Sequence, residues 1–240
     1  MMKLDVCFSP ELLPLYDLRG RVAVIVDVLR ATSTIVTALA AGVTEVFPTA
    51  TLEECAALGR EQGCITAAER DGIAAAGFDL GNSPFGFLDG KLAVPGRALA
   101  ISTTNGTMAL HRSLTAEAIV CGSFLNLSAV VDFVVAQGRD VLVVCAGWKG
   151  SFCLEDSLFG GALAERLAPL GFDIASSDAA LAALHLWQHA KPTWPEYLLQ
   201  SAAVRRLNAL EAHDDFTFCM HVDTHPEILP IWRTDRLVRG

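Results

Sequence analysis

The strongest constraint on the fold is a pattern of buried strands that recurs along the chain. Residues 22–26 (VAVIV) and 141–145 (VLVVC) are unbroken apolar runs rich in β-branched side chains, which is typical of strands covered on both faces of a parallel sheet. Residues 98–101 (ALAI) form a third apolar run. Each run is followed by a polar turn and then by a helical pattern. The repetition predicts an α/β fold, a three-layer α/β/α arrangement built on a mostly parallel sheet.

Other segments extend this alternation over most of the chain. The length of 240 residues allows one large α/β domain or two small ones. Thr51 and Glu54 have the spacing of a capping box at the start of a helix. Further strands are predicted at residues 4–8, 44–47, 64–67 and 118–121, and residues 216–222 are a candidate for the last strand. Helices are predicted at residues 35–41, 52–60, 108–112, 126–137, 157–170, 176–189 and 197–210.

Composition narrows the class of partner. The net charge is −9 and there is no run of Lys or Arg, which argues against a nucleic-acid partner. No segment approaches the roughly 18 consecutive apolar residues of a spanning helix, so no membrane partner is expected. The seven cysteines are odd in number and never form C-x-x-C, which predicts reduced core residues and neither disulfides nor a zinc site. We therefore expect a cytoplasmic enzyme or binding protein.

The first polar turn has the composition of an anion site. Asp27 stands where the strand 22–26 leaves the sheet, and Arg30 follows three residues later. Thr32, Ser33 and Thr34 then supply hydroxyls at the start of a helix. A helix N-terminus offers unpaired N–H groups and a positive dipole end to an anion, so the turn predicts a phosphate or sulfonate site. Taken alone, Asp27 and Thr32 are better explained as residues that cap the helix.

The later polar turns repeat this composition. Each also has a simpler explanation: a plain turn around Asn105 and Gly106, a helix dipole complemented by Glu155 and Asp156, or a weak surface pair at Arg70. These explanations leave the recurrence after buried strands unaccounted for. The residues concerned are Glu69 and Arg70 after 64–67, Thr103, Thr104, Asn105, Gly106 and Thr107 after 98–101, and Lys149, Glu155 and Asp156 after 141–145.

Charged side chains from these turns are expected to meet, because ligands of open parallel sheets bind outside the carboxyl ends of the strands. Four carboxylates and two guanidiniums would then share one crevice. Crowded carboxylates repel one another unless a cation lies among them, and oxygen ligands without His or Cys suit Mg²⁺. Hydroxyls, backbone N–H groups and arginines beside the ion predict a site for a small phosphorylated molecule.

Two further features bear on the kind of enzyme. Residues 71–96 are rich in Gly, Pro, Asn and Asp but also include Phe78, Phe85, Phe87 and Leu88, so we expect an ordered loop packed over the site. The chain has no GxxxxGK and no G-x-S-x-G motif. Leu29 stands where haloacid dehalogenase phosphatases have a second aspartate after Asp27, which disfavours an aspartyl-phosphate intermediate.

Four segments together resemble the 2-phosphosulfolactate phosphatase family, also called ComB. They are DVLRATSTI (27–35), GFDLGNSP (77–84), STTNGT (102–107) and CAGWKGSFCLEDSLFGG (145–161). Beyond Gly161 the resemblance is looser. It implies a ComB-like domain over residues 1–240, with a central cleft between two lobes, and a homo-oligomer. It also implies Mg²⁺-dependent hydrolysis of 2-phospho-3-sulfolactate to 3-sulfolactate and phosphate, a step of coenzyme M biosynthesis.

The resemblance also suggests roles for the polar residues. A carboxylate is expected to take a proton from a metal-bound water. The expected catalytic residues are Asp27, Arg30, Glu155 and Asp156, and the expected Mg²⁺ ligands are Asp27, Glu69, Glu155 and Asp156. The expected substrate-binding residues are Arg30, Thr32, Ser33, Thr34, Arg70, Asn82, Ser83, Thr103, Thr104, Asn105, Gly106, Thr107 and Lys149. Two alternatives stay open at this point: a phosphatase of another small phosphorylated hydroxy acid, and a non-catalytic sensor of an anionic metabolite.

Overall fold

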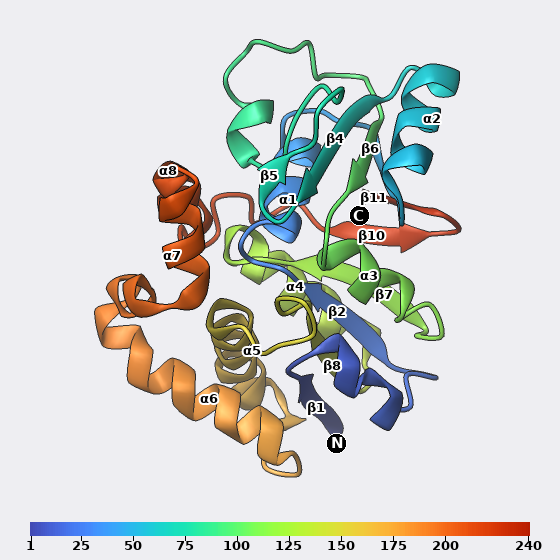
Figure 1. Cartoon of the computed structure of the whole chain (residues 1–240). Helices are drawn as coiled ribbons and strands as arrows, with labels where there is room; N and C mark the ends of the chain where they lie inside the picture. Colours follow the sequence, from blue (N-terminus) through green and yellow to red (C-terminus); the bar gives the residue numbers. More distant parts are fainter.

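The structure is a computed structural model that describes all 240 residues. It contains one eleven-stranded sheet with helices on both faces (Figure 1), so the predicted three-layer α/β/α fold is confirmed. The strands are β1 (Met2–Cys7), β2 (Val22–Val26), β3 (Glu45–Pro48), β4 (Ile65–Arg70), β5 (Ile73–Ala74), β6 (Leu99–Ser102), β7 (Ala118–Gly122), β8 (Val141–Cys145), β9 (Phe172–Asp173), β10 (Pro230–Arg233) and β11 (Arg236–Arg239). The α-helices are α1 (Ala31–Ala40), α2 (Leu52–Gln62), α3 (Gly106–His111), α4 (Leu127–Gln137), α5 (Leu154–Leu167), α6 (Asp178–Ala190), α7 (Ala202–Ala209) and α8 (His213–Cys219).

The sheet consists of two parallel blocks joined by a hairpin. The strand order is β5-β4-β6-β3-β11-β10-β7-β2-β8-β1-β9. Strands β4, β6 and β3 are parallel, and so are β7, β2, β8, β1 and β9. The hairpin β10–β11 pairs antiparallel with both blocks. In Figure 1, β4 and β6 run across the direction of β2 and β7, as expected from a twist of about 20–25° at each strand step.

The two central strands are buried on both faces, which explains their unbroken apolar sequences. Every residue of β2 and β8 is buried. Along β2 the side chains alternate: Val24 belongs to the core layer that contains residues of α4, α5 and α6, and Ile25 to the layer that contains residues of α1 and α3. A period of two along a strand places successive side chains on opposite faces. The sheet therefore has a hydrophobic core on each side.

Local signals place several elements as predicted. The capping box of α2 is present, with the Thr51 hydroxyl accepting from Glu54 N and the Glu54 carboxylate accepting from Thr51 N. Helix α5 begins at residue 154, earlier than the predicted 157, so Glu155 and Asp156 lie in its first turn. The predicted helix 197–210 is interrupted at Ser201, whose hydroxyl caps α7 by accepting from Val204 N. The predicted strand 64–67 continues to Arg70, because its end pairs with β5.

The prediction of a strand at residues 216–222 is wrong. These residues lie mainly in helix α8, where Phe216 and Cys219 face the core one turn apart. The last strands are instead β10 and β11, which the apolar pattern did not indicate. No helix of the structure combines the length and the apolar character needed to span a membrane. All seven cysteines are buried and unpaired, as predicted.

Candidate active site

A narrow cleft with a volume of about 30 Å³ lies where the carboxyl ends of β2, β4 and β6 meet helix α7. Five of the residues predicted for the site line it: Asp27, Arg30, Glu69, Asn82 and Asn105. The remaining walls include Asp71, Trp148 and Arg206, with Leu207 and Leu210 from the end of α7. The polar turns that are far apart in sequence therefore do meet at one cleft.

Asp27 is the central carboxylate of this cleft. It directly follows β2, is 8% exposed, and accepts a hydrogen bond from Ala31 N (3.3 Å) at the start of α1. Burial raises its pKa from 3.8 to about 7, with further contributions from the charges of Glu69 and Glu155. Gly106 packs against it, since a Cβ at Gly106 would lie 2.9 Å from Asp27 Oδ2. A glycine is needed here for the turn after β6 to approach Asp27.

Glu69 and Asp156 are held by backbone N–H groups. Glu69 accepts from Thr104 N (2.7 Å) and Gly72 N (2.6 Å), so it ties the turn after β6 to the turn after β4. Asp156 accepts from Val28 N (2.9 Å) and Gly147 N (3.1 Å), so it ties together the turns after β2 and β8. Each of the two side chains thus uses both oxygens to fix the backbone around the cleft.

The buried carboxyls form an electrostatic cluster. Glu155 is 3% exposed and its pKa is raised by burial. The pKa of Asp156 is raised well above its usual value by burial and by the charges of Glu155 and Asp27. The side chains are near enough for their charges to interact, yet no three His, Cys, Asp or Glu side chains of the chain are arranged around one point as metal ligands. The structure brings the four predicted metal ligands into one neighbourhood without assembling a complete coordination shell.

Arg30 is held in place by a residue that the sequence did not indicate. Its guanidinium forms a buried ion pair with Asp215 of α8 and donates to Gly72 O (2.9 Å). The other oxygen of Asp215 accepts from the Ser83 hydroxyl (2.6 Å). Arg30 thus lines the cleft while α8 and the 71–96 loop fix its orientation. Ser83 contacts Asp215 and does not line the cleft.

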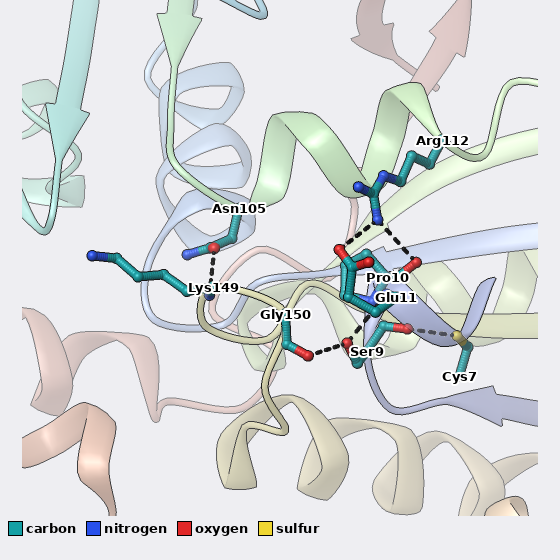
Figure 2. A network of polar contacts seen from close by, with 8 residues as sticks. All are labelled: Cys7, Ser9, Pro10, Glu11, Asn105, Arg112, Lys149 and Gly150. Atoms are coloured by element: carbon teal, nitrogen blue, oxygen red, sulfur yellow. Dashed lines mark hydrogen bonds and ion pairs between the residues drawn. The ribbon is translucent and has the colours of Figure 1, made fainter. Parts of the chain in front are cut away.

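The other two predicted cations point elsewhere. Arg70 donates to Glu69 O (2.6 Å) and to the Ser102 hydroxyl (3.0 Å), which fastens β4 to β6. Lys149 pairs with Asp71 through an exposed contact of 2.6 Å. Its backbone N–H donates to Asn105 Oδ1 (3.0 Å), as Figure 2 shows. Neither Arg70 nor Lys149 lines the cleft.

Most hydroxyls of the polar turns stabilise the turns themselves. The Thr32 hydroxyl donates to Asp27 O (2.9 Å) and the Ser33 hydroxyl to Val28 O (2.8 Å). After β6, the Thr107 hydroxyl donates to Thr103 O (3.0 Å), and Thr103 Oγ1 accepts from Thr107 N (3.3 Å). These contacts hold the turns locally, although neither Arg30 nor Asn105, the residues at which α1 and α3 begin, makes a side-chain capping hydrogen bond.

Three predicted substrate-binding residues instead have a buried polar atom without a partner. They are the Thr34 and Thr104 hydroxyls and the Oδ1 atom of Asn82. A buried polar atom without a hydrogen bond costs free energy, so such atoms are notable in a native structure. Asn82 lines the cleft, where its side chain is placed to contact a bound molecule.

Sequence reasoning missed three charged residues of the site, Asp71, Arg206 and Asp215. Arg206 lines the cleft from α7, and its guanidinium lies 4.2 Å from the centre of the Trp148 ring. Arg206 lies three residues after Ala203 and four before Leu210, so this spacing shows which face of the helix it occupies. The spacing does not show which part of the molecule that face contacts. Only the docking of α7 and α8 onto the strand ends brings Arg206 and Asp215 to the cleft. No local signal in the sequence indicates this docking.

The fold and the cleft define an α/β protein with buried carboxyls and cationic side chains at the ends of its strands. The family described as 2-phosphosulpholactate phosphatase matches residues 7–235. A protein of Thermotoga petrophila named "Probable 2-phosphosulfolactate phosphatase" is 41% identical over 212 residues, which cover 88% of each chain. A protein of Nostoc punctiforme with the same name is 37% identical over 240 residues, covering 96% of this chain and 95% of the relative.

The chain belongs to the 2-phosphosulfolactate phosphatase family. The family predicted from the four sequence segments is therefore confirmed, and with it the enzyme class, the phosphoric monoester hydrolases. The match extends past Gly161 to residue 235, so it includes α7 and α8.

Proposed function

We propose that the protein hydrolyses 2-phospho-3-sulfolactate to 3-sulfolactate and phosphate with the help of Mg²⁺. The observation that supports this most is the group of three buried carboxyls with raised pKa values, Asp27, Glu155 and Asp156, beside a cleft that also has cationic walls. Such an arrangement suits a site that binds a cation together with a polyanion. The names of the relatives supply the substrate.

The donor set fits Mg²⁺ in its chemistry, since it consists of carboxylate oxygens without a soft ligand. Asp27 and Glu155 are the preferred ligands of the ion, because each oxygen of Glu69 and of Asp156 already accepts a backbone N–H and keeps only one lone pair for an ion. When bound, Mg²⁺ supplies positive charge to the phosphoryl oxygens and makes a water molecule more acidic. Glu69 and Asp156 would then act by fixing the turns that carry the ligands.

The remaining side chains would bind and orient the substrate. Arg30 and Arg206 supply the positive charge that the cleft needs to accept a substrate with phosphate, carboxylate and sulfonate groups. Asn82 and Asn105 offer amide groups to the same molecule. A carboxyl of the cluster would accept the proton of the attacking water. Charge neutralisation is expected to provide most of the acceleration, because phosphate monoesters hydrolyse extremely slowly without a catalyst.

The test is phosphate release from a panel of phosphorylated hydroxy acids, each measured with Mg²⁺ and with EDTA. We expect turnover of 2-phospho-3-sulfolactate, dependent on Mg²⁺, at a higher kcat/KM than for the other acids. A preference for a different phosphorylated acid would reassign the substrate. Saturable binding of one acid without turnover of any would identify a sensor and contradict the proposal.

Three broader predictions accompany this function. We propose that the enzyme acts in the cytoplasm, that it assembles as a homo-oligomer, and that its reaction is a step of the coenzyme M biosynthesis type. Each stays a prediction. Size-exclusion chromatography with light scattering tests the second, and a monomer at micromolar concentration would contradict it.

A further inference from the structure

Arg206 is the one cation of the cleft that the chain leaves unpaired. Arg30 is paired with Asp215 and also donates to a carbonyl. Arg206 makes no ion pair and no side-chain hydrogen bond, although its side chain is only partly exposed. Arginine carries five N–H donors in a planar fork that matches an acid group. All five donors of Arg206 therefore remain for a bound molecule.

The position of Arg206 is fixed by an aromatic ring and by the loop that carries the ring. Its guanidinium lies 4.2 Å from the centre of the Trp148 ring. Stacking of this kind orients the fork while the donors at its edge stay accessible. The Trp148 backbone exchanges two hydrogen bonds with Ser151, of 3.0 and 2.9 Å. The ring that the guanidinium contacts is therefore held in place by backbone hydrogen bonds of its own loop.

Two adjacent residues of the same loop, Lys149 and Gly150, are hydrogen-bonded to other parts of the molecule (Figure 2). Lys149 N donates to Asn105 Oδ1, and Gly150 O accepts from the Ser9 hydroxyl. Ser9 and Asn105 belong to the turns after β1 and β6. Trp148 therefore keeps a fixed place relative to the strand ends where the carboxyl cluster lies.

The wall of the cleft around Arg206 differs from the acidic end. Helix α7 contributes Ala203, Leu207 and Leu210 beside Arg206 and no carboxylate. The carboxyls of Asp27 and Glu69 line the cleft from the strand ends. Glu155 lines a neighbouring pocket together with Trp148 and Arg206, and while burial raises the pKa of Glu155, the charge of Arg206 lowers it. No ion pair joins Arg206 to Glu155, so its donors are free while it lies near the carboxyls that would hold the ion. If the phosphate binds at the strand ends beside Asp27, a second acid group of the same small molecule is the group left to contact Arg206 on α7.

We propose that Arg206 is a specificity-determining residue that binds an acid group of the substrate other than the phosphate. The group is the sulfonate or the carboxylate, since both are anions with two or more oxygens for the guanidinium fork. Arg206 would thereby select substrates that carry this group, while the phosphoryl chemistry takes place at the strand ends. This role rests on the phosphatase function proposed above.

The test compares three substrates in two variants of adjacent arginines. Arg206→Met keeps the length of the side chain and removes the charge. Arg205→Met is the matched control, because Arg205 is exposed, points away from the cleft and donates to Gln200 O. The substrates are 2-phospho-3-sulfolactate, 2-phospholactate, which lacks the sulfonate, and 2-phosphooxyethanesulfonate, which lacks the carboxylate.

For 2-phospho-3-sulfolactate, we expect Arg206→Met to raise KM about 10- to 100-fold with kcat within about twofold, as for a lost charge-assisted hydrogen bond. The analogue that lacks the group bound by Arg206 should show nearly the same KM in the variant and the wild type. The analogue whose KM does not change therefore shows which group Arg206 binds, namely the group that this analogue lacks. In Arg206→Lys, KM should lie between the values of the wild type and of Arg206→Met. Arg205→Met should leave KM and kcat unchanged for all three substrates.

Equal losses with all three substrates, or a fall in kcat alone, would place Arg206 on the phosphoryl group or in a purely structural role and overturn the proposal. Calorimetric binding of the product 3-sulfolactate gives a readout that needs no turnover, and we expect it to weaken in Arg206→Met by the same factor as KM. If the wild type neither turns over the substrate nor binds the product, the phosphatase function fails and this role fails with it. If the wild type is active and Arg206→Met behaves as Arg205→Met does, only the role of Arg206 fails.

Discussion

At the scale of single residues, the site depends on carboxyls that the protein buries without pairing them to a cation of its own. Asp27 shows this most clearly, since burial and the charges of Glu69 and Glu155 raise its pKa to about 7. A buried carboxyl with a raised pKa is more stable in its neutral form, so its ionisation opposes folding. The ionised carboxyl therefore lowers the free energy of unfolding at the place where the protein would bind a divalent ion.

The first prediction concerns the pH dependence of stability without divalent ions. Because the folded pKa of Asp27 lies above the unfolded value of 3.8, the contribution of Asp27 to stability is present below about pH 4 and is lost as the pH rises through about 7. In urea unfolding, Asp27→Asn should lose less free energy of unfolding than the wild type between pH 5 and 8. The variant should also lose Mg²⁺-dependent phosphate release.

Addition of Mg²⁺ at pH 8 should stabilise the wild type and not Asp27→Asn, because a ligand that binds only the folded state shifts the equilibrium toward it. Parallel pH profiles of the two proteins would show that the Asp27 carboxyl does not titrate as a buried group. Full activity of Asp27→Asn would remove Asp27 from the catalytic site.

The second prediction concerns the ion pair between Arg30 and Asp215. Removal of one partner of a buried pair leaves the other charge buried and costs about 3–5 kcal/mol. We expect Asp215→Ala to lower the free energy of unfolding by about this amount and to raise KM, since Arg30 and Ser83 lose the group that orients them. Asp214→Ala is the control, because Asp214 is the adjacent exposed residue. Its effect should stay within about 0.5 kcal/mol, and an equal effect of both variants would contradict the role of Asp215.

At the scale of secondary-structure elements, helix α5 carries two of the buried carboxyls and also packs closely on α6. Its first turn carries Glu155 and Asp156, and its middle packs closely on α6 through Gly161. A Cβ at Gly161 would contact the carbonyl oxygen of Ala183 and lie 2.6 Å from Trp187 Cβ, which is too close without a shift of α6. The adjacent Gly160 has only ordinary distances, the nearest being 3.5 Å to Val6.

The third prediction therefore compares two neighbouring glycines in the same helix. Gly160→Ala should be neutral or stabilise the protein by up to about 1 kcal/mol, because Ala favours a helix over Gly. Gly161→Ala should destabilise it by about 1–3 kcal/mol, because it overpacks the contact with α6. Thermal unfolding of both variants measures the difference. Equal melting temperatures would show that α5 and α6 pack less closely than the structure describes.

The elements that the sequence predicted correctly are those with a local signal. The runs at β2 and β8 match their predicted bounds residue for residue, because burial on both faces demands apolar residues throughout. The hairpin β10–β11 was missed because its strands have only four residues each and contain charged side chains. Its pairing with β3 and β7 joins residues about 110 or more positions apart. Such long-range pairing leaves no periodic trace in the sequence.

At the scale of the whole molecule, the cleft forms because two parallel blocks of one sheet cross each other. The three successive antiparallel pairings at the hairpin reverse the strand direction between the blocks. The sheet twist then turns the end of β6 toward the end of β2 (Figure 1), so that Gly106 packs against Asp27. The sequence predicted that polar turns follow buried strands. The crossing that makes them meet, and the cover formed by α7 and α8, depend on contacts between distant segments.

The most direct test of the central claim is a crystal structure of the protein grown with Mn²⁺ in place of Mg²⁺, with the ion located by its anomalous scattering. We expect one ion at the cleft, bonded directly to carboxylate oxygens of Asp27 and Glu155, and no ion there in Asp27→Asn. An ordered cleft without an ion, or an ion that contacts neither residue, would contradict the claim that the converging strand ends form a metal-assisted phosphatase site.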